Sequence, residues 1–184
     1  MRGGLGIGFE QAKVGREITT RSESTSGVGE VNASYEGFGA VGDALGAVRI
    51  RRALVGLALV GGHSDLVPRP SEDAQALSVE PQAGLDWALI GPSGGAQIAA
   101  GPVFVVGGMF GFGNVQTRGF VGPPDVSVTS SQLVDSVMGV SGWAGPAWPL
   151  GRGWMLGAHL RVTALIEPAL TEAALLLDLS FQSP

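Results

Sequence analysis

Residues 154–166 read WMLGAHLRVTALI, and this stretch decides the fold. Every second residue is apolar, beginning with Trp154, whereas His159, Arg161 and Thr163 lie at intervening positions. Successive side chains of a β-strand point to opposite faces of the sheet, so a period of two separates these two sets. The stretch therefore predicts a strand with one apolar face and one largely polar face.

The same alternation recurs along the chain. It is clear at residues 5–10, 79–89 and 175–182, and it is less regular at residues 38–50, 53–62, 96–112 and 132–148. A membrane-spanning barrel strand gives a weak signal by itself, so the repetition carries the argument. Together with residues 154–166, these segments predict eight strands.

The connections between the predicted strands alternate in length. Short turns are expected at residues 51–52, 91–94 and 149–153, and longer polar loops at residues 15–32, 63–76, 114–130 and, smaller, 167–171. Short turns at one end and long loops at the other are typical of membrane-spanning β-barrels. The sequence thus predicts one domain over residues 1–184, an all-β, eight-stranded antiparallel up-and-down transmembrane β-barrel.

The composition agrees with a surface that faces lipid. Hydrophobic residues make up 45% of the chain and charged residues 15%, against about 25% charged residues in soluble domains. The uncharged run 95–113 is long enough for a membrane helix. Its glycines, Pro102 and many valine and phenylalanine residues disfavour that alternative. We therefore expect strands in this run.

Several function classes find no support in the sequence. The chain has no cysteine, which excludes disulfides and thiolate metal sites. Its net charge of −5 gives no basic surface for nucleic acid. The two histidines lie far apart and the acidic residues are scattered, so we expect no metal site. The glycine strings lack the strand and helix of a nucleotide loop, so we expect no cofactor.

Aromatic residues gather near both ends of the predicted strands. We expect two girdles at the membrane interfaces, where aromatic rings collect. The residues near the short turns are Trp87, Trp148, Trp154 and Phe181, and those near the long loops are Tyr35, Phe38, Phe110 and Phe112.

The second face of each strand points into the barrel. The charged residues expected there are Glu10, Asp43, Arg49, Glu80, Asp86, His159, Arg161 and Asp178. Buried charges are costly unless they are paired. A final turn near residues 168–169 would place His159 opposite Asp178 and Arg161 one diagonal step away. We therefore predict a cluster of His159, Arg161 and Asp178, joined by Glu10 where the barrel closes.

With these residues in view, the chain resembles the small bacterial outer-membrane β-barrels of the OmpA/OmpX type over nearly its whole length. The C-terminal run 175–181 resembles the terminal strand signal of such proteins, although three residues follow Phe181. The resemblance implies a monomer in outer-membrane lipid, inserted by the barrel-assembly machinery.

Three functions follow from these expectations. The first is a structural or adhesive outer-membrane protein whose interior is plugged by polar side chains and whose long loops lie outside the cell. The second is a narrow pore or small-solute-binding outer-membrane protein, with the interior charges forming an ion or proton path. The third is a soluble lipocalin-like ligand-binding barrel, whose interior would be apolar. A segment of a larger barrel is a further alternative.

One candidate for catalysis is the sequence His63-Ser64-Asp65, where the third predicted strand ends. Some lipid-modifying enzymes on such barrels use a histidine and a serine near the outer membrane face. Adjacent strand residues point to opposite faces, however, so His63 and Ser64 would not meet. We therefore expect no catalytic residues and no enzyme.

Overall fold

The computed structural model describes residues 1–22, 25–68, 83–99, 103–118, 126–127, 134–166 and 170–182. Within these ranges, the side chains of residues 12–35 and of a few strand ends are not described. Eight long strands run through the described residues: β1 (Arg2–Ser22), β2 (Thr25–Ile50), β3 (Ala53–Pro68), β4 (Ala83–Ala99), β5 (Val103–Arg118), β7 (Val134–Gly151), β8 (Trp154–Leu165) and β9 (Leu170–Phe181). A two-residue strand, β6 (Val126–Ser127), pairs with β1.

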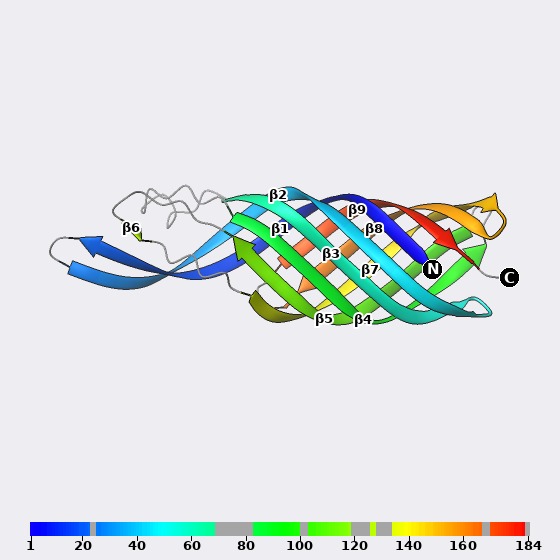
Figure 1. Cartoon of the computed structure of the whole chain (residues 1–184), viewed down its shortest axis with the longest axis horizontal. Helices are drawn as coiled ribbons and strands as arrows, with labels where there is room; N and C mark the ends of the chain where they lie inside the picture. The colour runs from blue at the N-terminus through cyan, green and yellow to red at the C-terminus, as the bar shows by residue number, and fades with distance from the viewer. Residues whose placement is uncertain are drawn as a thin grey trace.

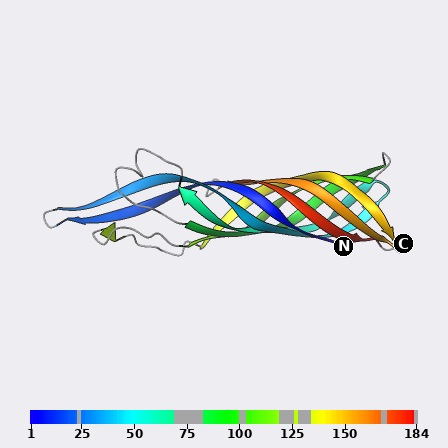
Figure 2. The same ribbon diagram turned by 90° about the horizontal axis from the view of Figure 1, so that it is seen from above.

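The eight long strands form a closed ring. Each pairs in antiparallel fashion with the next long strand in the chain. The last strand, β9, pairs with β1 from Arg2↔Ser180 to Ala12↔Leu170. Figures 1 and 2 show the strands tilted around a common axis, with both chain termini at one end. This confirms the predicted eight-stranded antiparallel up-and-down barrel.

The strands connect closely at one end, which we call the turn end; the opposite end is the loop end. Ile50 pairs with Ala53 across a tight turn in which Arg51 adopts a φ of 58°. The turn between β7 and β8 contains Gly151 and Gly153, with φ of 97° and 83°. Glycine adopts such values without steric cost, which explains its place in this turn.

The short turn predicted at residues 91–94 was wrong. These residues lie inside β4, and the hairpin closes between Ala99 and Val103, which pair with each other. Ladder pairing with β5 is interrupted at Gly91 and Pro92, whereas pairing with β3 continues through both. Proline lacks a backbone N–H, so the strand accommodates it as a local interruption rather than a turn.

The long loops are also shorter than predicted. The expected loop at 15–32 is a continuation of β1 and β2, which remain paired up to Ser22↔Thr25. This hairpin projects beyond the rest of the barrel (Figures 1 and 2). Similarly, β3 and β5 extend into the loops predicted at 63–76 and 114–130. In the sequence, these segments have polar residues at both odd and even positions, so no apolar alternation marks them as strands.

No described segment is a helix of the length and hydropathy needed to span a membrane. The uncharged run that raised this alternative contributes residues to β4 and β5.

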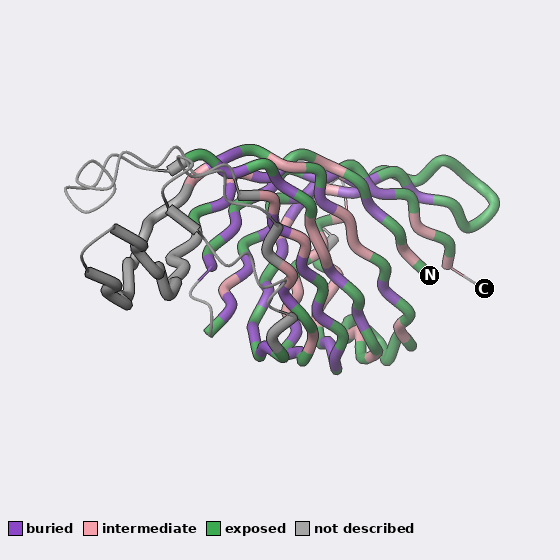
Figure 3. Tube along the Cα trace, turned by 60° about the vertical axis from the view of Figure 1, so that its left-hand side comes forward, coloured by how far each residue is buried: buried purple, intermediate pink, exposed green. Residues whose placement is uncertain are grey.

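The exterior of the barrel is apolar. Outward residues such as Leu160 and Leu177 are 64% and 65% exposed, and many more exposed leucine, isoleucine, valine and phenylalanine side chains surround the barrel. Figure 3 shows buried and exposed residues alternating along the strands. Monomeric soluble proteins rarely expose contiguous apolar patches of this extent. The exterior is therefore that of a membrane-spanning barrel.

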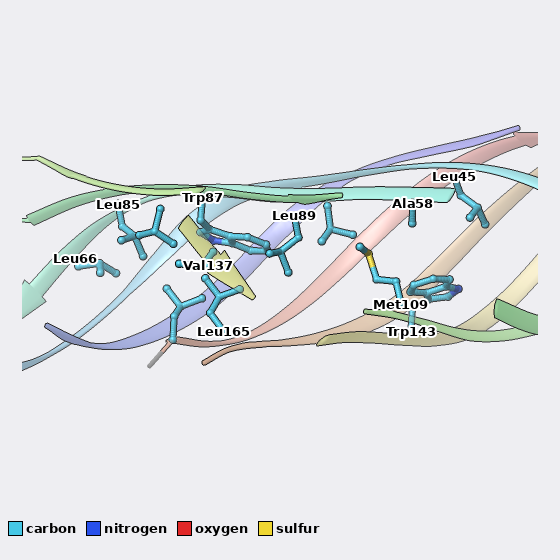
Figure 4. Packing of buried hydrophobic residues seen from close by; sticks show 13 residues of the cluster. Leu45, Ala58, Leu66, Leu85, Trp87, Leu89, Met109, Val137, Trp143 and Leu165 are labelled. Atoms are coloured by element: carbon cyan, nitrogen blue, oxygen red, sulfur yellow. The ribbon is translucent and has the colours of Figure 1, made fainter. Parts of the chain in front are cut away.

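The interior is divided between apolar and charged side chains. The buried apolar cluster of Figure 4 extends from Leu66 and Leu85 near the loop end to Leu45 and Trp143 toward the turn end. Charged side chains occupy the middle of the barrel and are described below.

Candidate functional site in the barrel interior

Arg161 is the centre of the first charged group. It lies on β8 and is completely buried. Its Nε and Nη2 atoms donate to the two carboxylate oxygens of Glu172 on β9, at 3.1 and 2.8 Å. Its Nη1 atom donates to the backbone oxygen of Gly42 on β2, at 2.8 Å. The guanidinium therefore links neighbouring strands β8 and β9 to a strand on another side of the ring.

Glu10 and Trp87 complete this group, which we call the Arg161 group (Arg161, Glu172, Glu10 and Trp87). The guanidinium carbon of Arg161 lies 5.7 Å from the centre of the Trp87 ring, within cation–π range. The indole Nε1 of Trp87 donates to Oε1 of Glu10 at 3.1 Å. Gly62 makes room for this contact, because a Cβ there would lie 2.8 Å from both atoms.

The second group lies nearer the turn end; we call it the His159 group (His159, Asp178, Asp43 and Arg2). Nδ1 of His159 lies 2.9 Å from Asp178 Oδ2, and Nε2 lies 3.0 Å from Asp43 Oδ2. A neutral imidazole has only one N–H. Two carboxylate neighbours therefore require either an imidazolium or one protonated carboxyl. Arg2 also binds Asp43 at 3.0 Å, which gives that carboxylate a second partner.

Five of the predicted interior residues belong to these two groups: Glu10, Asp43, His159, Arg161 and Asp178. They do not form the single predicted cluster. Asp178 lies opposite Gly157 rather than His159, and His159 reaches it diagonally. The register differs because Leu165 pairs with Leu170, which places the hairpin turn earlier than predicted. Arg161 consequently pairs with Glu172 instead of Asp178.

Three other predicted interior residues have different positions. Arg49 is exposed at the turn end, where its Nη1 lies 3.5 Å from Gln97 Oε1 and 3.3 Å from Gln182 Oε1. Asp86 was assigned to the wrong face: it lies on the outer side of β4, with its Oδ1 2.5 Å from Nδ1 of exposed His63. Glu80 lies outside the described residues.

The prediction for Trp87 was also wrong. The residue was predicted to belong to the aromatic girdle, but it is 4% exposed inside the barrel. Both errors on β4 have one cause. The sequence predicts that the polar residues of this strand point inward, whereas the interior at this position is apolar and contains Leu85, Trp87 and Leu89.

Sequence reasoning missed Glu172, Arg2 and the interior role of Trp87. Glu172 has the same strand parity as Asp178, with Ala174 and Leu176 between them. Extending the alternation of the last strand toward its start would have found it. The sequence predicts a loop at residues 167–171 and a last strand only from residue 175, so Glu172 lies outside the predicted strand, whereas β9 begins at Leu170.

The remaining girdle residues fall into two sets. Trp148, Trp154 and Phe181 are exposed at the turn end, with the rings of Trp154 and Phe181 5.1 Å apart. Phe38, exposed near the loop end, contacts the ring of Phe9 at 5.2 Å.

Phe110 and Phe112 lie on the outer surface, but not at the loop end where they were predicted. Their strand, β5, continues to Arg118. The two residues therefore lie nearer the middle of the apolar exterior. Tyr35 is part of β2, and its side chain lies outside the described part of the structure.

A cavity opens at the turn end, and we call it the vestibule. Its volume is about 1140 Å³. His159 and Asp178 line its inner part, and Arg49, Arg152, Gln97 and Gln182 line its mouth. Its walls include Leu45, Leu54, Val105, Ala147 and Met155. The vestibule therefore combines an apolar wall with basic side chains at its opening.

The His63-Ser64-Asp65 sequence places its members on alternate faces. His63 and Asp65 are exposed, whereas the Ser64 side chain is buried inside the barrel. Among the described residues, no group of three or more histidine, aspartate or glutamate side chains has an arrangement suited to a metal ion.

The closed ring of strands, the short turns and the apolar exterior now define the architecture. The chain has the fold of a small outer-membrane β-barrel. This is the fold that the resemblance to the OmpA/OmpX type implied.

No protein-family model matches the sequence, and no curated protein matches it. Similar solved structures include Neisserial surface protein A, with a TM-score of 0.43 and 11% identity, covering 97% of this chain and 97% of that chain. Ail, the attachment invasion locus protein of Yersinia pestis, has a TM-score of 0.39 and 13% identity, and the match covers 98% of this chain and 99% of that chain. The outer-membrane protein AlkL in lipid bilayers has a TM-score of 0.38 and 14% identity, and the match covers 100% of this chain and 92% of that chain. The fold assignment rests on strand pairing and on the exterior.

Proposed function

We propose that this chain is a bacterial outer-membrane protein with a structural or adhesive role, a plugged interior, and loops presented outside the cell. The apolar exterior supports residence in lipid. Outer-membrane barrels place their short turns in the periplasm and their longer loops outside the cell. On this proposal, the β1–β2 hairpin projects from the cell surface.

The observation that carries the plug is the order of inward residues along β8. From the turn end toward the loop end, this strand presents Met155, His159, Arg161 and Leu165 to the interior. They belong in turn to the vestibule wall, the His159 group, the Arg161 group and the apolar cluster. Three successive layers, namely the His159 group, the Arg161 group and the loop-end part of the apolar cluster, thus lie between the vestibule and the loop end. An eight-stranded barrel has an interior that side chains can fill.

Conductance in planar bilayers tests the plug against the pore alternative. The refolded chain should give no discrete single-channel steps. The variant Arg161→Ala/Glu172→Ala removes two large side chains from the middle layer and should raise conductance. His63→Ala, on the outer face, is the matched control and should behave as the wild type. Reproducible steps from the wild type would make the narrow pore the leading function.

Membrane residence has its own test. A refolded barrel should migrate faster on a gel before boiling than after it, and it should require detergent to stay monodisperse. A β-rich chain that is monodisperse without detergent would instead favour the lipocalin-like alternative. We also propose that the chain is a monomer, with lipid in contact with the outer face of every strand. Chemical crosslinking in lipid vesicles should therefore yield no dimer or larger species.

The adhesive role is tested by shortening the hairpin that projects beyond the barrel. Val14 and Ala33 pair in register, so an Asn-Gly turn can join them and replace residues 15–32. Cells that display the shortened chain should lose attachment to host cells or matrix, while the heat-modifiable gel shift remains. If attachment is unchanged, the adhesive role is wrong and only the structural role remains.

We further propose that the barrel-assembly machinery inserts this chain and that it acts without a catalytic step or cofactor. The terminal strand β9, with Leu175, Leu177, Leu179 and Phe181 on its outer face, supports recognition by that machinery. Replacing Phe181 by serine should lower the amount of folded barrel in outer membranes. In contrast, refolding of the same variant from urea into detergent should be nearly normal.

A further inference from the structure

We propose that the vestibule binds a small amphiphile, consisting of an anionic headgroup on a short apolar chain. This site lies at the end of the barrel opposite the projecting hairpin. It is therefore independent of the adhesive role proposed above.

The charges around the vestibule indicate an anion. The segments at the turn end contain Arg49, Arg51, Arg52 and Arg152, and no acidic residue occurs in residues 44–64, 87–118 or 136–166. Arg49 and Arg152 line the mouth of the vestibule. The structure gives Arg49 only amide partners, at 3.3 and 3.5 Å, and gives Arg152 no ion pair among the described residues.

The acidic residues deeper inside do not neutralise this mouth. Asp178 is engaged with His159, and Asp43 is engaged with both His159 and Arg2. A carboxylate or phosphate at the mouth would therefore meet two guanidinium groups that lack an anionic partner in the described structure. Guanidinium groups bind such oxyanions through directional, charge-assisted hydrogen bonds.

The wall of the vestibule indicates an apolar chain on that anion. Leu45, Leu54, Val105, Ala147 and Met155 contribute to it, from five different strands. The volume of about 1140 Å³ is ample for a small molecule, since ligand pockets commonly measure about 300–1,000 Å³. The charged His159 group limits the depth available to the chain. A short chain therefore suits the site better than a full lipid tail.

Methionine methyl groups provide the test, because three of them report on different environments. Met155 lies in the vestibule wall, Met109 is buried in the apolar cluster, and Met138 is exposed on the outer face. The full chain with ¹³C-methyl methionine in zwitterionic nanodiscs is titrated with sodium octanoate and with octyl phosphate. Octyltrimethylammonium serves as the cationic control.

The proposal expects a saturable shift of the Met155 methyl signal with at least one anion and none with the cation. A response to octanoate alone assigns a carboxylate headgroup, and a response to octyl phosphate alone assigns a phosphate. Arg49→Gln and Arg152→Gln should each weaken binding by about fivefold, typical of one partly exposed charged contact. Arg51→Gln is the matched control, because Arg51 does not line the vestibule.

Several results would overturn the proposal. One is a shift that grows linearly and equally at Met155 and Met138, which would show partition into lipid only. Others are equal binding of the cation and the anions, or an affinity that neither Arg49→Gln nor Arg152→Gln changes. The gel shift on boiling verifies that each variant is folded. Loss of attachment on shortening the hairpin has no bearing on these outcomes, so the two proposals can fail separately.

Discussion

Arg161 and Glu172 form a completely buried bidentate pair, with donor–acceptor distances of 3.1 and 2.8 Å between Nε and Oε1 and between Nη2 and Oε2. The two residues are not directly opposite: Arg161 pairs with Ala174 in the ladder, and Glu172 pairs with Thr163. The contact is therefore diagonal, and it is compatible with this register of β8 against β9 while it fills the interior.

Removing one partner of this pair should be costly. Glu172→Gln leaves the Arg161 charge without its bidentate carboxylate, and we expect the free energy of unfolding to fall by about 3 kcal/mol. The double variant Arg161→Met/Glu172→Gln removes the unpaired charge and should recover at least half of that loss. Urea titration in lipid vesicles measures both values. A double variant that is as unstable as Glu172→Gln alone, or less stable, would contradict this account of the pair.

The two histidines offer a comparison of buried and exposed contacts of one chemical type. His159 is buried between two carboxylates, whereas His63 is exposed beside Asp86. His159→Ala should lower the free energy of unfolding by about 3 kcal/mol, and His63→Ala by less than about 1 kcal/mol. The same urea titration applies. Equal losses would show that burial of the His159 group has little energetic weight.

Gly107 illustrates why some inward positions must lack a side chain. A Cβ at Gly107 would lie 2.7 Å from two carbon atoms of the buried Trp143 indole, whereas a Cβ at Gly46 would meet no atom within 4 Å. Gly107→Ala should therefore destabilise the barrel by about 1–3 kcal/mol. Gly46→Ala is the control and should be neutral. Equal stability of both variants would mean that the Trp143 ring can move without cost.

The tryptophans should separate by their access to lipid. Trp148 and Trp154 are 45% and 44% exposed on the exterior, whereas Trp87 and Trp143 are buried inside. In single-tryptophan variants, brominated lipids should quench the fluorescence of Trp148 and Trp154 strongly and that of the other two weakly. Strong quenching of Trp87 would restore it to the girdle and reverse the face assignment of β4.

The sequence was sufficient to predict the barrel because the alternation recurs in eight segments. The repetition is clear even though the pattern of a single segment can be ambiguous. The sequence was also sufficient for His159, Arg161 and Asp178 because their strands have one plainly apolar face, so these polar residues had to lie on the other face. It failed at Trp87 and Asp86 because it assumed a polar interior throughout, and the interior of β4 is apolar. The partner of Arg161 depends on the register between β8 and β9, which differs by two residues from the predicted one. No local sequence pattern specifies that register.

The outward His63–Asp86 contact bears on the choice of membrane. Along β3 the outer face is apolar from Ala53 to Leu59 and becomes polar at His63 and Asp65. At the turn end, Trp154 and Phe181 mark the other boundary. A strand tilted by about 40° rises by about 25 Å from Ala53 to His63, and this apolar height is usual for such barrels. A thicker bilayer would have to thin around the protein to avoid burying the histidine–aspartate contact. Because of this hydrophobic mismatch, we expect the barrel to insert fastest into bilayers of short-chain lipids. Insertion should become slower as the acyl chains lengthen.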